Sequence, residues 1–472
     1  MDRIWDFSAQ EPRIALRDDR GNTLTYEEMQ YETDRLAAAT GGRCLVFSLC
    51  RNEIGSIMGY AAFVNHGIVP LLLSSRLEDS LLRNLIDTYA PSYLWIPEDQ
   101  SGRFADMEAV YSAHGYALMK TARQEAYPLN DALGLLLTTS GSTGSPKLVR
   151  QSYVNIIDNA QSIVKYLELD AEERPITTLP MNYTYGLSII NSHLLAGATI
   201  LVTDKDFTQR GFWDFFREAG ATSFGGVPYT YEMLDRMRFY RMELPSLRTM
   251  TQAGGKILPD IQEKFAKYAV ENDKRFFVMY GACEATARMG YLPAEMALVK
   301  KGSVGIAIPG GRFRLIDGDE REITDPNVVG ELIYEGKNVT LGYAECGADL
   351  NRGDECHGVL KTGDMAYFDE DGFFYISGRK KRFLKIFGNR VNLDEMERLI
   401  RGRFNVDAAC TGIDDRLSIF TTEETLMKPI QEYAAAVTRL NPSAFRVIHI
   451  DEIPKNDSGK TLYSALEQYN GL

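Results

Sequence analysis

A run of small and hydroxyl-bearing residues that ends in a lysine is the part of the sequence best suited to chemistry. It covers residues 138–147 and reads Thr-Thr-Ser-Gly-Ser-Thr-Gly-Ser-Pro-Lys. Small side chains leave backbone N–H groups free to approach an anion, and the hydroxyls and the lysine donate further hydrogen bonds. The run follows the apolar residues 135–137 and precedes a predicted helix starting near Tyr153, which argues against a flexible linker. We predict a phosphate-binding loop. It is not a Walker A loop, because Pro146 stands where that motif needs glycine.

Other segments carry residue types that phosphate, metal and carboxylate chemistry need. They are Tyr280-Gly281-Ala282-Cys283-Glu284, Gly330-Glu331-Leu332 followed by Gly342-Tyr343, Lys361-Thr362-Gly363-Asp364, Gly378-Arg379 with Lys385 and Gly388, and Pro454-Lys455 with Gly459-Lys460. Together with the 138–147 loop, and in the same order, they resemble the motifs of the acyl-adenylate-forming superfamily. That superfamily includes acyl- and aryl-CoA synthetases, adenylation domains of nonribosomal peptide synthetases, D-alanine–carrier-protein ligases and beetle luciferases.

The resemblance implies a two-step reaction that uses ATP and Mg²⁺. A carboxylate first attacks the α-phosphate to give acyl-AMP and pyrophosphate, and a thiol then takes the acyl group. By resemblance, Lys460, Glu284 and Thr143 are the catalytic residues. Glu284 is also the expected Mg²⁺ ligand, since that ion binds few carboxylates together with phosphates. Lys460 would bring a positive charge between two anions in the first step, which stabilises the transition state.

The same resemblance predicts the groups around the nucleotide and the acyl chain. Tyr280 is expected against the adenine, and Asp364 is expected to accept hydrogen bonds from the ribose hydroxyls. The predicted nucleotide-binding residues are Thr139, Ser140, Gly141, Ser142, Thr143, Gly144, Lys147, Ala253, Gly254, Gly255, Tyr280, Gly281, Cys283, Asp364 and Arg379. The predicted acyl-binding residues are Tyr183, Tyr185, Gly225, Gly226 and Ala282. These small or apolar groups predict a pocket with little charge and an uncharged aryl or short-to-medium acyl substrate.

Two residues depart from the family pattern. Cys283 stands where the family has a threonine whose hydroxyl bonds the α-phosphate, and a thiol is a weaker donor. Tyr183 stands where the gate of the acyl pocket is often histidine, and a tyrosine does not titrate near neutral pH. No aspartate occurs between residues 179 and 195, where amino-acid-activating members usually carry one. This argues against an amino-acid substrate without excluding it.

Length and composition define the class of protein. With 472 residues the chain exceeds the roughly 250–300 residues at which one hydrophobic core stops growing, so several structural units are expected. A net charge of −13 disfavours nucleic acid as a partner. The six scattered cysteines indicate reduced thiols and a cytoplasmic location. The sequence has neither an apolar N-terminal segment nor 18 consecutive apolar residues, so we expect no secretion signal and no membrane partner.

The chemistry needs a scaffold of alternating strands and helices. Helix-like stretches at 26–40, 56–66 and 76–89 alternate with short apolar runs, and a second such cycle follows from 132 to 224. This predicts an α/β fold with two α/β lobes. Turn-rich segments beyond Gly302 predict a β-rich subdomain, followed by a small, mobile α+β C-terminal domain. The expected domains are therefore 1–378 and 379–472, with a hinge near Lys381 and a catalytic lysine loop at 454–460.

The thiol acceptor stays open at this point. The short N-terminal lobe and the lack of a fused carrier domain slightly favour the phosphopantetheine of an acyl carrier protein over CoA, with a small carboxylic acid as substrate. The main alternative is an acyl- or aryl-CoA synthetase proper. An amino-acid–carrier-protein ligase, a luciferase-like oxygenase and a non-catalytic nucleotide-binding protein are further alternatives with less support.

Overall fold

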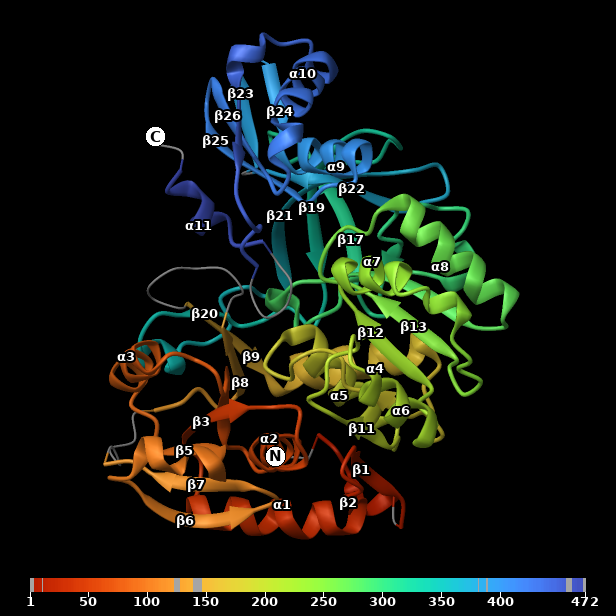
Figure 1. The fold of residues 1–472 in the computed structure, drawn as a ribbon. Coiled ribbons are helices and arrows are strands. Elements are labelled where there is room, and N and C mark those ends of the chain that lie inside the picture. The colour runs from red at the N-terminus through yellow and green to blue at the C-terminus, as the bar shows by residue number, and fades with distance from the viewer. Residues whose placement is uncertain are drawn as a thin grey trace.

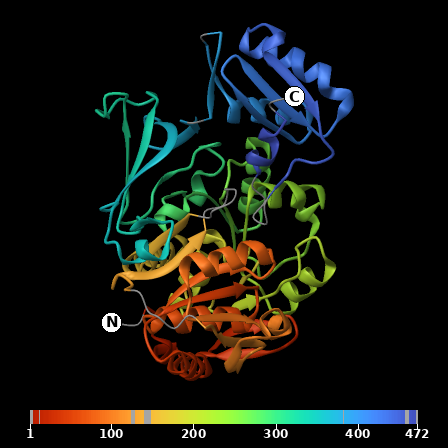
Figure 2. The same ribbon diagram turned by 90° about the vertical axis from the view of Figure 1, so that its left-hand side faces the viewer.

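The computed structural model describes residues 4–10, 12–122, 128–138, 147–380, 382–387, 389–455 and 461–469. Two large sheets with their helices occupy one end of the molecule, and the C-terminal elements lie at the other end (Figures 1 and 2). A smaller sheet lies between them. The predicted fold class is confirmed: two α/β lobes and a β-rich part precede a small α+β part.

The first lobe contains an eight-stranded sheet whose central strands are parallel. In spatial order it comprises β20 (Gly342–Ala344), β9 (Leu148–Ser152), β8 (Leu133–Thr138), β4 (Val69–Ser74), β3 (Leu45–Cys50), β5 (Tyr93–Pro97), β7 (Tyr116–Lys120) and β6 (Glu108–Ala113). The helices of this part are α1 (Tyr26–Thr40), α2 (Ile54–Asn65) and α3 (Asp79–Tyr89). The span predicted for the first helix is the observed one, because Thr25 and Glu28 form a capping box and Gly41 ends the helix at φ +73°.

The second lobe contains a nine-stranded sheet. In spatial order it comprises β16 (Ile306–Ala307), β15 (Gly290–Leu292), β14 (Arg275–Tyr280), β13 (Thr249–Gln252), β12 (Ser223–Gly226), β10 (Pro175–Ile176), β11 (Ile200–Val202), β1 (Ile14–Asp18) and β2 (Thr23–Thr25). Its helices are α4 (Tyr153–Leu167), α5 (Thr184–Leu195), α6 (Arg210–Glu218), α7 (Pro228–Arg236) and α8 (Pro259–Glu271). The two predicted cycles do not map onto separate sheets, since β8 and β9 join the first sheet and β1 and β2 join the second.

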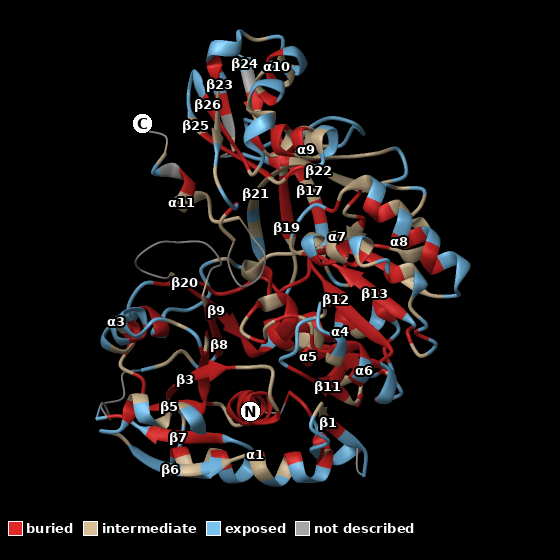
Figure 3. Ribbon diagram, in the orientation of Figure 1, coloured by how far each residue is buried: buried red, intermediate tan, exposed pale blue. Residues whose placement is uncertain are grey.

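Helix α2 forms part of the layer between the two large sheets. All of its residues are buried, as the red ribbon in Figure 3 shows, and it contacts β3, β4 and β5 of one sheet and β1 of the other. A helix that is apolar on every side is stable only when it is covered on every side. Burial of α2 therefore joins the two lobes through one hydrophobic core.

The remaining elements form the β-rich part and the C-terminal part. The β-rich sheet has the order β18 (Glu322–Ile323), β17 (Arg312–Ile316), β19 (Gly330–Glu335), β21 (Val359–Phe368) and β22 (Phe374–Arg379). The C-terminal part contains the hairpin β23 (Phe383–Ile386) and β24 (Asn389–Asn392), the sheet β25 (Ala408–Ile413), β26 (Arg416–Thr421) and β27 (Phe445–His449), and the helices α9 (Leu393–Phe404), α10 (Met427–Thr438) and α11 (Tyr463–Glu467). Within the described ranges, none of the helices is long and apolar enough to cross a membrane.

Strand β20 reaches the first sheet from a distant part of the chain, and a buried arginine holds it there. Arg150, on β9, donates from Nε to the carbonyl of Tyr343 and from Nη2 to that of Leu341, each at 3.0 Å. Its Nη2 also pairs with a carboxylate oxygen of Glu355 at 2.5 Å. The side chain of Arg150 is fully buried, so its charge is neutralised and its donors are used inside the protein.

We expect Arg382→Leu to loosen the C-terminal part. Arg382 pairs with the largely buried Glu397 at 2.5 Å, stacks on the ring of Tyr463 at 3.8 Å and also pairs with Asp394 at 2.8 Å. Removing the guanidinium leaves Glu397 without its cation, which costs about 3–5 kcal/mol for a buried pair. Hydrogen exchange measured by mass spectrometry should show faster opening of residues 393–413. Arg398→Leu is the matched control on α9, because its partly exposed pair with Glu395 contributes less than about 1 kcal/mol. Equal protection in both variants would contradict this prediction.

Candidate active site

Most of the predicted site residues that the structure describes lie at one edge of the second sheet. Strands β10, β12, β13 and β14 are neighbours and run parallel, so their carboxyl ends meet at this edge. The residues at or just beyond these ends are Tyr183, Tyr185, Gly225, Gly226, Ala253, Gly254, Gly255, Tyr280, Gly281, Ala282, Cys283 and Glu284. The carboxyl edge of an open α/β sheet is where such folds bind ligands.

The predicted phosphate loop connects two paired strands of the first sheet. Thr138 at the end of β8 pairs with Leu148 at the start of β9. Residues 139–146 lie outside the described residues, and so do the predicted catalytic Lys460 and the predicted hinge Lys381. Thr143 and its predicted neighbours from Thr139 to Gly144 therefore stay predictions.

Lys147, the first described residue after this loop, lies close to Tyr343, which in turn contacts Glu284. The ammonium of Lys147 lies 4.0 Å from the ring centroid of Tyr343, a cation–π contact, and the Tyr343 hydroxyl donates to Oε1 of Glu284 at 2.9 Å. Lys147 also lies 3.7 Å from a carboxylate oxygen of Glu345. Burial and the neighbouring Glu284 raise the pKa of Tyr343, so its hydroxyl stays protonated and donates. The sequence analysis used Tyr343 only as part of a motif, and the pairing of β20 with β9 gives it a position in the site.

Glu284 offers a single carboxylate at this point. It sits in a short helical turn, Cys283–Ala285, directly after β14, and its backbone carbonyl accepts from Thr340 at 3.0 Å. The carbonyl of Cys283 accepts from the Gln151 side chain at 3.2 Å, which ties the turn to β9. In the described parts of the chain no cluster of three or more His, Cys, Asp or Glu side chains could hold a metal ion alone. A cation at Glu284 would therefore need further oxygen ligands from a substrate or from water.

Asp364, Tyr280 and Arg379 form a second polar group. Asp364 on β21 pairs in register with Arg379 on β22, and the Arg379 Nε lies 3.7 Å from Oδ1 of Asp364. The Tyr280 hydroxyl, at the end of β14, donates to Oδ2 of Asp364. Burial raises the pKa of Asp364, although the Tyr280 hydrogen bond and Arg379 act in the opposite direction. The structure thus brings together a tyrosine and a carboxylate that the sequence places 84 residues apart.

Close backbone approaches explain two glycines at this edge. A Cβ at Gly281 would lie 1.7 Å from the carbonyl oxygen of Ala287, which no side chain rotation could relieve. Gly254 has φ +85°, and a Cβ there would lie 2.6 Å from the Tyr183 hydroxyl. Glycine is required at both positions, because larger residues would displace backbone or the Tyr183 ring.

Tyr183, at the predicted gate position, and Tyr185 pack over the ends of β12 and β13. Tyr183 precedes α5 and meets Tyr185 edge to face, with ring centroids 6.3 Å apart. The Tyr185 hydroxyl donates to the carbonyl of Thr251 at 2.8 Å. A Cβ at Gly225 would lie 3.0 Å from the Tyr185 hydroxyl, so the room left by this glycine is taken up by protein atoms.

A charged residue that the sequence analysis missed lies against this gate. The guanidinium carbon of Arg288 is 4.3 Å from the Tyr185 ring centroid, and Arg288 is only 1% exposed. The prediction of a pocket with little charge did not include this arginine, which is buried beside Tyr185. An arginine four residues beyond Glu284, between apolar residues, was the available signal.

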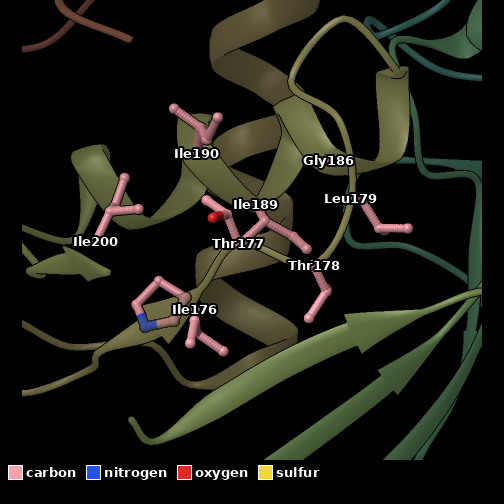
Figure 4. Close-up of a pocket in the computed structure, with 9 residues that line it drawn as sticks. Ile176, Thr177, Thr178, Leu179, Gly186, Ile189, Ile190 and Ile200 are labelled. Atoms are coloured by element: carbon pink, nitrogen blue, oxygen red, sulfur yellow. The ribbon is translucent and has the colours of Figure 1, made fainter. Parts of the chain in front are cut away.

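Two small cavities lie beside α5. The first, shown in Figure 4, is lined by isoleucines, threonines and other residues without charge, and leaves about 10 Å³ for the centre of a water molecule. We interpret it as a packing gap beneath the helix. The second leaves about 20 Å³ and is lined in part by Arg288, His193 and Thr251. It is the only one of these two cavities with a charged side chain in its wall.

The C-terminal part contacts the second lobe next to this edge. Lys455 pairs with Asp407 at 2.5 Å, and its ammonium lies 5.0 Å from the ring centroid of Tyr229, the second residue of α7. Lys455 and Thr461 form an antiparallel bridge, so both ends of the predicted lysine loop lie close together. Lys256, in the second lobe, donates to the carbonyl of Ile376 on β22 of the β-rich part at 2.9 Å. The described ends of the loop thus lie close to α7, which follows Gly225 and Gly226 directly.

Comparison with known proteins identifies the family. The model of the AMP-binding enzyme family matches residues 5–344. The indoleacetate–CoA ligase of Aromatoleum aromaticum is 31% identical over 405 residues, which are 80% of this chain and 78% of that protein. The peroxisomal OPC-8:0-CoA ligase 1 of Arabidopsis thaliana is 29% identical over 353 residues, 70% of this chain and 63% of that protein. The chain thus spans less than two thirds of the length of this relative, and the same holds for other CoA ligases that it matches.

Solved structures show the same fold. The o-succinylbenzoate–CoA synthetase of Bacillus subtilis, in complex with an acyl-adenylate intermediate, has a TM-score of 0.80 at 22% identity. The alignment covers 99% of this chain and 98% of that one. The same synthetase has also been solved with AMP, and with ATP and a magnesium ion. From the family match and the 31% identical relative, we conclude that the chain belongs to the AMP-binding enzyme family.

Proposed function

We propose that the protein is an AMP-forming acid–thiol ligase that activates a carboxylic acid with ATP and transfers the acyl group to CoA. The observation that carries this proposal is the convergence of Lys147, Tyr343 and Glu284 beside the 138–147 loop, with Asp364 and Tyr280 at the end of β14. These cationic and acidic groups would suit the phosphates, the metal and the ribose of one nucleotide, which supports the proposal.

The relatives bear on the thiol acceptor. Both relatives described above are named as CoA ligases, and the solved synthetase is named for CoA as well. Sequence analysis slightly favoured an acyl carrier protein, and the relatives support the alternative instead. We therefore adopt CoA as the acceptor and keep a carrier protein as the competing outcome of the experiment.

The residues fit the nucleotide and the metal that the proposal requires. Asp364 is a carboxylate with two acceptor oxygens, suited to the two hydroxyls of a ribose. Lys147 carries a positive charge on the flank of the loop and would face phosphate oxygens. Glu284 would supply the protein ligand of Mg²⁺, with phosphate oxygens and water completing the coordination. When bound, Mg²⁺ would neutralise charge on the departing pyrophosphate.

The proposed chemistry has two displacements. An oxygen of the substrate carboxylate attacks the α-phosphorus of ATP, the α–β phosphoanhydride bond breaks, and pyrophosphate leaves with the bonding electrons. The thiol of CoA, as its thiolate, then attacks the acyl carbon, and AMP leaves. We assign Lys460 to the first step, where its ammonium would lie between the carboxylate and the α-phosphate. Residues 379–472 would act as a unit that pivots near Lys381 and withdraws Lys460 before the second step.

We expect Lys460→Ala to remove the first step and spare the second. Carboxylate-dependent release of pyrophosphate from ATP should fall by about 100-fold or more, the size expected for loss of one transition-state charge contact. Thioester formation from a chemically synthesised acyl-adenylate and CoA should persist. A panel of carboxylic acids identifies the substrate first, and CoA and a holo-carrier protein are then offered separately.

Lys428→Ala is the control, since Lys428 is an exposed lysine in the same part of the chain. Equal loss of both steps in Lys460→Ala, or thioester formation only on the carrier protein, would contradict the assignment.

We expect Asp364→Asn to weaken ATP binding without destabilising the fold. The raised pKa of Asp364 means that the folded protein holds this proton more tightly than the unfolded chain, so its contribution to stability improves as the pH falls and is unfavourable at neutral pH. Asparagine carries no charge and avoids that cost. The KM for ATP should rise roughly 10- to 100-fold through loss of charge-assisted hydrogen bonds, while the melting temperature at pH 7 stays equal or rises. A lower melting temperature with all KM values changed would indicate a structural role instead.

A further inference from the structure

Arg288 is a buried cation whose hydrogen-bond partners are all neutral. Its Nε and Nη2 donate to the Ser188 hydroxyl at 3.2 and 3.0 Å. Its Nη1 donates to the Tyr166 hydroxyl at 3.4 Å and to the Met279 sulfur. The remaining contact of the guanidinium is the face of the Tyr185 ring. Hydroxyls, a thioether and an aromatic face orient the charge without neutralising it.

No carboxylate that the structure describes lies within 4.0 Å of the Arg288 guanidinium. The other fully buried arginine of comparable depth, Arg150, is paired with Glu355 and with backbone carbonyls. Transfer of an unpaired charge from water to a protein interior is strongly unfavourable, and buried charges are therefore normally paired. Arg288 lacks the counter-ion that Arg150 has.

The backbone around Arg288 fixes its position. The Arg288 carbonyl accepts from the side-chain amides of Asn159 at 2.9 Å and Asn338 at 2.8 Å, and both asparagines are buried. The two preceding residues, Thr286 and Ala287, have φ of +51° and +106°, a conformation that is unfavourable for residues with a Cβ. The chain thus uses strained backbone and buried hydrogen bonds to present this arginine inward.

A second unsatisfied group lines the same cavity. His193 is buried, and its Nδ1 lies 2.8 Å from the carbonyl of Ile189, so Nδ1 carries the proton and donates. Its Nε2 is buried without a hydrogen-bond partner in the described structure. Burial lowers the pKa of His193 to about 4, so it is neutral at physiological pH and does not add charge. The cavity, with about 20 Å³ for the centre of a water molecule, has room for one water beside Nε2.

We propose that Arg288 binds a second anionic group of the substrate, remote from the carboxylate that is activated. The substrate class is then dicarboxylic acids and other carboxylic acids with a distal anionic group. This inference rests on the proposed carboxylate activation and replaces the expectation of an uncharged acyl chain. Arg288 is the specificity-determining residue, and the orphaned His193 Nε2 accepts from a water or hydroxyl at the distal end.

The gate links Arg288 to the predicted acyl site. Tyr185 stacks on Arg288 on one side and meets Tyr183 on the other, and its hydroxyl is fixed by Thr251. The second cavity is lined by Arg288 together with Gly225, a predicted acyl-binding residue, and Thr251, so an acyl chain at Gly225 would extend toward Arg288. A guanidinium offers parallel N–H donors to a carboxylate, which gives geometry as well as charge. A purely space-filling role would be served better by leucine or methionine, which bring no desolvation cost.

The experiment compares matched pairs of acids in which an isopropyl group replaces one carboxylate. The pairs are malonate and 3-methylbutanoate, succinate and 4-methylpentanoate, glutarate and 5-methylhexanoate, and terephthalate and 4-isopropylbenzoate. For wild type we expect the anionic member of the best pair to have the higher kcat/KM for pyrophosphate release. Arg288→Leu should lower the ratio of the two kcat/KM values roughly 100-fold, largely through KM of the diacid, and Arg288→Lys should keep part of the preference.

A binding measurement keeps the test independent of turnover. The preferred diacid should raise the melting temperature of the wild-type protein in the presence of AMP, and this increase should be lost in Arg288→Leu. Arg312→Leu is the matched control, because it removes an exposed positive charge far along the chain, in β17, and should leave both readouts unchanged.

The two proposals fail in different ways. Turnover of the monoacids at rates equal to the diacids, in wild type, would overturn the role of Arg288 and leave the ligase function in place. Absence of pyrophosphate release with every acid would count against the ligase function. Binding of a diacid by Arg288 would then be tested by the melting temperatures of wild type and Arg288→Leu with each diacid. Absence of a diacid-dependent increase, or an equal increase in Arg288→Leu, would overturn the inference. If Arg288→Leu does not fold, the proposal is tested by the diacid preference of the wild-type protein and by the reduced preference expected for Arg288→Lys.

Discussion

The arrangement of the site depends on the buried Arg150 and the strand that it holds. Tyr343 reaches Glu284 and Lys147 only because β20, which follows β9 by almost 190 residues, pairs with β9 at Arg150. The Arg150 guanidinium donates hydrogen bonds to backbone carbonyls in and next to β20, and it forms an ion pair with the carboxylate of Glu355. Burial of such a network carries a desolvation penalty, and its benefit is that it stabilises one arrangement of the chain over others. Here that arrangement brings Tyr343 against Lys147 and Glu284.

The two fully buried arginines illustrate two uses of the same residue type. Arg150 has all of its charge balanced within the protein, so it serves the fold whether or not a ligand is present. Arg288 is held by equally specific contacts, but these are neutral and leave an electrostatic imbalance inside the molecule. A protein that keeps such an imbalance gives up stability at that point, which is the usual relation between stability and a binding function. On our proposal, the negative charge that balances Arg288 comes from a bound substrate.

Sequence reasoning was most successful where local rules act alone. The predicted span 26–40 of α1 is the observed one, because the capping box at Thr25 starts the helix and Gly41 ends it. The motif residues Tyr280 and Asp364 do meet, although the role of each at a nucleotide is still a proposal. Strand partnership was not predictable, because the sequence of an apolar strand such as β8 does not specify which sheet it joins, and only tertiary packing decides. Arg288 was missed for a related reason: arginine is normally exposed, and apolar neighbours on either side do not by themselves predict that it is buried.

The contact between the C-terminal part and the second lobe bears on the proposed pivoting motion. Its described interactions include the contact of the Lys455 ammonium with the Tyr229 ring on α7. Burial raises the pKa of Glu232, on α7, and the nearby Asp407 adds repulsion that Arg401 and Lys455 offset. An interface of compensating charges costs little to separate, because water replaces each polar partner, whereas separation of an apolar interface exposes hydrophobic surface. The same helix α7 follows β12, so the surface that contacts the C-terminal part lies next to the strand end at which we propose that the acyl group binds.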